Sequence, residues 1–149
     1  MSPERLWRLA IRLQRAGWPR AAKRVKQLNS FLYHNSLAAG AEVSSDVYLG
    51  HHGLGTVVND RVTIGRRVKI WHNVTLAVRA PTDPAHRIVI SDDVVIGAGA
   101  VVITPEGSGL TIGAGARIGA GAVVTHDVPA GRTAVGVPAT LRPRRVEQP

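Results

Sequence analysis

The stretch IGAGARIGAGAVV, residues 112–124, repeats an aliphatic residue followed by Gly-Ala-Gly-Ala with a period of six. The same period runs through most of the chain, with a branched aliphatic residue opening each hexad. An α-helix would show a period near 3.6 and an amphipathic strand a period of two, so neither explains the pattern. Twelve positions open a hexad: Val43, Leu49, Val58, Ile64, Ile70, Leu76, Ile90, Ile96, Val102, Ile112, Ile118 and Val124.

A strict period of six predicts short parallel strands stacked as a triangular prism, with each leading aliphatic side chain pointing inward. Three hexads complete one coil, so twelve hexads make about four coils. The period is broken by three extra residues within HHGLG (51–55), eight within AVRAPTDPAHRIV (77–89) and four within ITPEGSGL (103–110). Insertions leave such a coil as loops, and we expect functional residues there.

The stacking also predicts which residues lie above one another. One inward column should contain Leu49, Ile70, Ile96 and Ile118. The residues two places later should line one outer edge of the prism: His51, His72, Ala98 and Ala120. This edge would carry imidazoles on adjacent coils at one end and small side chains at the other, which is the arrangement of a groove.

The composition excludes several classes of protein. The chain has no cysteine, so a disulfide framework and a thiolate metal site are excluded. No run approaches the ~20 apolar residues of a membrane-spanning helix. Residues 1–18 carry arginines inside their apolar pattern, unlike a secretory signal peptide, so we expect a cytoplasmic location.

Three segments are expected: residues 1–34 as basic amphipathic helices, 35–140 as the coil and 141–149 as a basic tail. Helices are predicted at 3–16 and about 19–33, the first with an inward stripe of Leu6, Leu9, Ala10 and Leu13. The net charge of +9 is concentrated in these helices and the tail. Trp7 and Trp18 beside arginines resemble a helix at a membrane surface. Solvated basic faces and peripheral contact of residues 1–34 with an anionic membrane both stay open, while nucleic acid is not expected as a partner.

The hexads, with TAVGVPA (133–139), resemble the hexapeptide-repeat acyltransferases. Within them, the stretch from FLYHNSLAAG (31–40) to LGHHGLGTVV (49–58), with VKIWHNVTL (68–76), resembles serine O-acetyltransferases and related sugar or polysaccharide O-acetyltransferases. This resemblance covers about residues 31–140. It implies an all-β domain, a left-handed parallel β-helix behind two short α-helices, which forms homotrimers. It also implies acetyl-CoA as co-substrate in a groove between subunits, an acceptor hydroxyl, and no metal.

The resemblance implies a histidine general base on the acceptor hydroxyl, a role that suits an imidazole near neutral pH. Strand register assigns this base to His51, and a register counted three residues back from Gly55 assigns it to His52. The second catalytic histidine of the family matches His86, whose alternative is a solvated loop side chain. His72 would line the acceptor groove. Coenzyme contacts fall on Ala77, Ala98, Ala120 and Arg117.

Two departures leave the acceptor open. Serine acetyltransferases place an aspartate about fifteen residues before the base, where this chain has Ser36 beside Asn35. They also carry an acid directly before the base, where this chain has Gly50. A sugar hydroxyl fits these losses better than L-serine does. A non-catalytic polyanion-binding scaffold and a carbonic-anhydrase-like zinc site remain as alternatives, although the zinc site lacks a third histidine close after His72.

Overall fold

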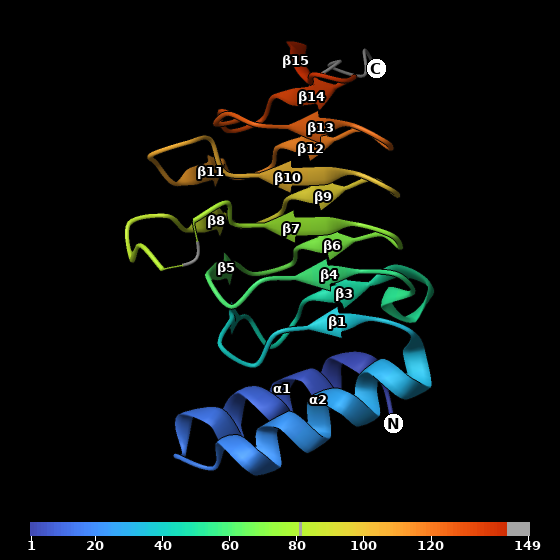
Figure 1. Ribbon diagram of the computed structural model, residues 1–149. Helices are drawn as coiled ribbons and strands as arrows, with labels where there is room; N and C mark the ends of the chain where they lie inside the picture. Colours follow the sequence, from blue (N-terminus) through green and yellow to red (C-terminus); the bar gives the residue numbers. More distant parts are fainter. Residues whose placement is uncertain (81, 143–149) are drawn as a thin grey trace.

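A computed structural model describes residues 1–80 and 82–142 (Figure 1). Two helices, α1 (Pro3–Arg15) and α2 (Pro19–Tyr33), lie side by side beneath a coil of short strands. Each helix has a proline in its first turn, where the missing N–H leaves no bond unmade. α1 ends in a Schellman motif at Gly17 (φ +79°), with the Trp18 N–H bound to the Leu13 carbonyl at 2.9 Å.

The strands wind into a left-handed parallel β-helix whose three faces are three sheets (Figure 1). The first sheet contains β1 (Ser36–Leu37), β4 (Val57–Val58), β7 (Thr75–Ala77), β10 (Val101–Ile103) and β13 (Val123–Val124). The second contains β2 (Glu42–Val43), β5 (Val62–Ile64), β8 (Ile88–Ile90) and β11 (Leu110–Ile112). The third contains β3 (Tyr48–Leu49), β6 (Lys69–Ile70), β9 (Val95–Ile96), β12 (Arg117–Ile118), β14 (Thr133–Val135) and the antiparallel β15 (Thr140–Arg142).

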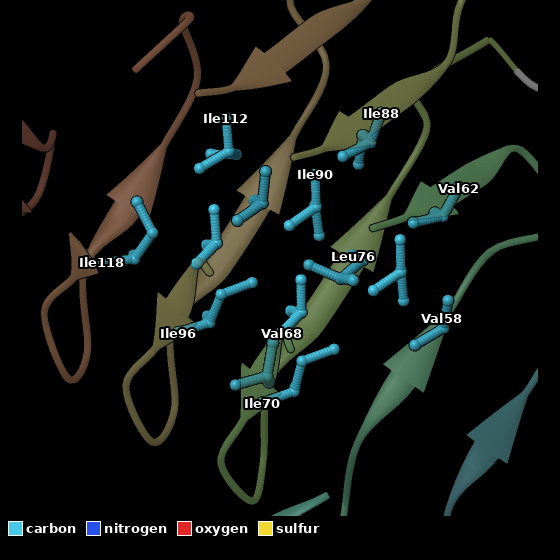
Figure 2. Close-up of a cluster of buried hydrophobic side chains, with 14 of the residues drawn as sticks. Val58, Val62, Val68, Ile70, Leu76, Ile88, Ile90, Ile96, Ile112 and Ile118 are labelled. Atoms are coloured by element: carbon cyan, nitrogen blue, oxygen red, sulfur yellow. The ribbon is translucent and has the colours of Figure 1, made fainter. Parts of the chain in front are cut away.

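The register of these strands confirms the hexad prediction. Leu49 pairs with Ile70, which in turn pairs with Ile96, and Ile96 pairs with Ile118. Of the twelve hexad-opening residues, eleven are at most 3% exposed, and Val43 is partly buried at the bottom of the coil. In Figure 2, members of this set that are labelled point toward the interior of the prism: Val58, Ile70, Leu76, Ile90, Ile96, Ile112 and Ile118. Burying each one stabilises the fold by about 1.5–3 kcal/mol.

The three breaks in the period leave the coil at two different corners. The HHGLG segment forms a turn between β3 and β4, at the corner between the third and first sheets. The segments joining β7 to β8 and β10 to β11 both leave at the corner between the first and second sheets (Figure 1). The topology therefore separates the histidine turn from the loop that carries His86.

α1 covers the open end of the first coil. Its Glu4 carboxylate accepts a hydrogen bond from the Leu49 N–H (3.1 Å), and Trp7 Nε1 donates to the Ala38 carbonyl (2.8 Å). Arg8 donates to the Ser45 carbonyl. These bonds satisfy backbone groups that an unpaired strand edge would otherwise expose.

This packing corrects the expectations for α1. Trp7 is 1% exposed, so its proposed place at a membrane surface is wrong. Leu9, expected on the inward stripe, is 40% exposed, whereas Ile11 is buried. The helix is rotated so that polar and aromatic side chains reach the edge of the coil, which apolar periodicity alone does not reveal.

The coil ends at the third sheet. β15 pairs antiparallel with β14, so Leu141 and Arg142 of the expected tail belong to a strand. The rest of that tail, residues 143–149, lies outside the described residues.

Candidate active site

The insertion HHGLG folds as a strained turn. Gly50–Gly53 forms a 3-10 turn in which His51 (φ 49°, ψ 41°) and His52 (φ 58°, ψ 23°) are both left-handed. This conformation costs a non-glycine residue about 1–2 kcal/mol. Strain of this kind persists where the surroundings enforce it, and it gathers at functional sites.

Because of the insertion, neither histidine takes part in the row of backbone hydrogen bonds that joins successive coils at this corner. Along this corner, the Gly121 N–H donates to the Ala98 carbonyl (2.8 Å) and the Gly99 N–H to the His72 carbonyl (3.0 Å). One coil lower, the Asn73 N–H donates to the Leu54 carbonyl (2.7 Å) rather than to His51. In the backbone, Leu54 therefore stands one coil below His72, at the position that strand register had predicted for His51.

The side chain of His51 nevertheless meets the column. Its ring centroid lies 4.9 Å from that of His72, with the planes at 90°, and 5.9 Å from that of Trp71. His72 Nδ1 is buried and has no hydrogen-bond partner among the described residues. Buried polar atoms are rarely left unpaired, so this nitrogen is a candidate contact for a ligand or a water molecule.

His52 points elsewhere. Its ring stacks on that of Tyr33, at the end of α2, with centroids 5.7 Å apart and planes at 20°. The two adjacent imidazoles therefore diverge, one toward the column of small residues and one toward the helices. Of the two, His51 is the one that meets the corner column, and both histidines are exposed.

Sequence reasoning missed Trp71 and its contact with Gly50. A Cβ built on Gly50 would lie 2.5 Å from Trp71 Cε3, so the indole lies directly against the backbone before the histidine pair. Trp71 is 37% exposed, and its ring meets the edge of Tyr48 at 6.3 Å and 81°. The only sequence signal was an aromatic residue placed directly before the column histidine, in VKIWHN (68–73).

The small residues continue the corner as expected. The coils approach so closely that a Cβ on Gly97 would lie 2.5 Å from the Ala120 backbone nitrogen. Arg117 is exposed on the outer face of the third sheet, in the same row as Lys69. Ala77 lies instead at the end of β7 in the first sheet, half-buried and outside the corner column.

His86 is not a solvated loop side chain. It is 7% exposed, its Nε2 lies 3.5 Å from Asp83 Oδ2, and its Nδ1 has no partner among the described residues. It precedes β8, at the corner between the first and second sheets. One chain therefore does not bring His86 and His51 together.

Near the position where serine acetyltransferases carry an aspartate, this chain has the buried amide of Asn35, close to the histidine turn. Ser36 begins β1 on the outer face of the first sheet, whereas Asn35 is only 6% exposed. Asn35 Nδ2 donates to Asn29 Oδ1 (3.4 Å) and lies 3.8 Å from where a Cβ on Gly53 would be. Its Oδ1 is buried and has no partner within the described part of the chain.

Within residues 1–80 and 82–142, no group of three or more His, Cys, Asp or Glu side chains could hold a metal ion. No helix in the same residues is long and apolar enough to span a membrane.

Curated proteins similar to this chain are serine acetyltransferases, although no family model matches it. The enzyme of Bacillus licheniformis is 34% identical over 117 residues, which make up 78% of this chain and 52% of that protein. The enzyme of Helicobacter pylori strain J99 is 34% identical over 133 residues, or 89% of this chain and 75% of that protein. The chain thus spans about half the length of its Bacillus relative and three quarters of its Helicobacter relative.

Solved structures similar to this chain are also serine acetyltransferases. The serine acetyltransferase of Brucella abortus in complex with coenzyme A superposes with a TM-score of 0.84 at 28% identity, covering 94% of this chain and 54% of that one. The soybean serine acetyltransferase complexed with serine gives 0.82 at 33% identity, covering 92% and 54%. The likeness extends over the helices as well as the β-helix.

Proposed function

The chain belongs to the serine acetyltransferase family, and on that premise we propose that it transfers the acetyl group of acetyl-CoA to an acceptor hydroxyl. The observation that carries the proposal is the histidine turn, with the His51 ring 4.9 Å from His72 at the corner that small residues continue. The relatives are named for serine. A sugar hydroxyl and the serine hydroxyl are the two acceptors under test.

In this mechanism His51, as the neutral imidazole, accepts the proton of the acceptor O–H. The acceptor oxygen attacks the thioester carbonyl carbon, a C–O bond forms and the C–S bond breaks. The imidazolium then returns the proton to the departing coenzyme A sulfur. His72 lines the acceptor groove and offers its unpartnered Nδ1 to a ligand.

The coenzyme is proposed to bind along the corner and the third sheet. We propose that Ala98 and Ala120 let the pantetheine arm approach the coil backbone, and that Ala77, at the end of β7 and outside that corner, is a further coenzyme contact. Arg117 supplies positive charge for the phosphates, and Lys69 extends that charge along the same row.

A homotrimer is the assembly that we propose, and the first sheet is its interface. The outward positions of that sheet carry no charge, although the chain has 29 charged residues, 19 basic and 10 acidic. They are Ser36, Val57, Thr75, Ala77, Val101, Ile103 and Val123. A closed ring of prisms brings different corners of neighbouring subunits together, and in the proposed trimer His86 of one subunit approaches the histidine turn of the next.

We also propose that residues 1–34 contact an anionic membrane surface. Trp18, Leu28 and Phe31 are 66%, 47% and 78% exposed, and α2 carries four basic residues and no acidic one. Apolar and basic side chains together favour a negatively charged lipid surface. The protein should sediment with vesicles that contain anionic lipid at low salt and be released at high salt; equal binding to neutral vesicles would contradict the proposal.

The catalytic proposal is tested by coenzyme A release, with L-serine and simple sugars supplied in parallel. His51→Ala should lower the rate by about 10²–10⁴-fold, the usual contribution of general base catalysis. Circular dichroism and light scattering should show an unchanged fold and assembly. Loss confined to His52→Ala would move the base by one residue. Tight acetyl-CoA binding without turnover on any acceptor would instead favour the non-catalytic scaffold.

A further inference from the structure

An aromatic wall adjoins the histidine turn. The Trp71 indole lies against Gly50, so that any side chain at position 50 would displace it. The centroid of the indole lies 5.9 Å from that of the His51 ring, with the planes tilted by 47°, and 6.3 Å from that of the Tyr48 ring, edge to face at 81°. Both aromatic side chains are open to solvent, at 37% for Trp71 and 50% for Tyr48. A planar apolar surface is therefore exposed within one ring's distance of the proposed base.

The charges around this wall are positive. The outward row of the third sheet runs through Tyr48, Lys69, Val95, Arg117 and Thr133, with two cations and no carboxylate. The Glu4 carboxylate, which approaches β3, already accepts the Leu49 N–H (3.1 Å). A free amino acid would find a partner for its carboxylate in Lys69 or Arg117 but none in this row for its ammonium group, whereas an uncharged sugar needs neither.

We propose that Trp71, supported by Tyr48, is the acceptor platform, and that the acceptor is a carbohydrate whose ring stacks on the indole. The negative π face of an indole attracts the polarised C–H groups on one face of a sugar ring, while the sugar hydroxyls point outward from its rim. Such stacking would present one hydroxyl to His51. This inference rests on the proposed acetyl transfer and names its acceptor class. Gly50 is then part of the specificity, because it makes room for the indole where an acidic side chain would stand.

Binding can be measured separately from turnover. The probes are methyl glycosides of hexoses and N-acetylhexosamines, with L-serine alongside, followed by saturation-transfer NMR on the full chain. A glycoside should bind the unaltered protein, Trp71→Ala should weaken that binding about tenfold or more, and Trp71→Phe should restore part of it. Trp18→Ala, an exposed tryptophan in the α1–α2 connection, is the matched control and should change nothing.

Kinetics complete the test. Trp71→Ala should raise KM for the glycoside about tenfold and leave KM for acetyl-CoA unchanged. The inference is overturned if no glycoside binds, if L-serine is acetylated with a higher kcat/KM than every glycoside, or if Trp71→Ala leaves glycoside binding intact. A glycoside that binds through Trp71 but is never acetylated would support the platform and contradict the proposed acetyl transfer. Failure of the platform and failure of the transfer reaction therefore give different results.

Discussion

Two glycines of one hexad, Gly97 and Gly99, meet different surroundings. A Cβ on Gly97 would lie 2.5 Å from the Ala120 nitrogen, whereas a Cβ on Gly99 meets nothing within 4 Å. Because backbone cannot move aside, Gly97→Ala should lower the free energy of unfolding by about 1–3 kcal/mol. Gly99→Asn is the control, since Asn73 already occupies the same left-handed corner one coil below. It should change stability by less than about 0.5 kcal/mol in denaturant titrations.

For single residues, the sequence predicts the position along the coil better than the direction in which the side chain points. The period of six correctly placed Leu49, Ile70 and the small corner residues, because inward packing enforces the register. It could not predict that His51 and His52 diverge, since that depends on two left-handed backbone conformations inside an insertion. The contact of Trp71 with Gly50 was equally hidden, because it joins residues on adjacent coils.

α1 acts as a cover for the first coil, and Trp7 tests this role. Trp7→Phe keeps most of the buried ring and removes the hydrogen bond to the Ala38 carbonyl (2.8 Å). Leaving that carbonyl unpaired should lower the free energy of unfolding by about 1–3 kcal/mol, measured by urea titration. Trp18→Phe, at a position 66% exposed, should have almost no effect. Equal effects of the two substitutions would mean that the hydrogen bond from Trp7 to the first coil does not stabilise the fold.

A row of ionic contacts links three coils at the corner between the second and third sheets. Arg67 Nε and Nη2 donate to the Asp93 carboxylate at 2.7 and 2.9 Å, and the Arg67 backbone N–H donates to Asp46 (3.1 Å). The side-chain hydrogen bond from Arg67 lowers the pKa of Asp93. For Asp46, the hydrogen bond from Ser44 is the main cause of a lowered pKa, followed by that from Arg67.

Lowered carboxylate pKa values stabilise the fold above the unfolded value of about 4, and the gain is lost as the pH falls through the folded values. The melting temperature should therefore drop between pH 7 and pH 3. Asp93→Asn should show a smaller drop than the unaltered protein, because it removes one of the groups that must be protonated. Glu106→Gln, on the exposed segment between β10 and β11, serves as the control and should leave the drop unchanged.

Apolar periodicity predicted the existence and limits of both helices but not which face of α1 is buried. The inward stripe was drawn through Leu9, whereas the coil edge needs the hydrogen-bonding groups of Glu4, Trp7 and Arg8. The burial of His86 was also missed, since nothing in the composition of its loop distinguishes a packed imidazole from a solvated one.

On the scale of the whole molecule, the three faces of the prism differ in charge. Arg87 on the second face lies 3.6 Å from Glu42 and donates to Thr63, and the third face carries Lys69 and Arg117. The outward positions of the first face are uncharged from coil to coil. An uncharged face on a strongly basic chain is the face on which copies can associate without mutual repulsion.

Val101 and Val89 allow a matched test of that interface. Val101 stands between Thr75 and Val123 on the first face, and Val89 between Thr63 and Thr111 on the second; both are half-buried. Val101→Lys would bring like charges from three subunits together and desolvate them, so light scattering should show the trimer replaced by a species of monomer mass. Val89→Lys adds the same charge outside the interface and should leave the trimer intact. Acetyl transfer should fall with the trimer, because the proposed groove needs a neighbour; an active monomer would instead place the whole site within one chain.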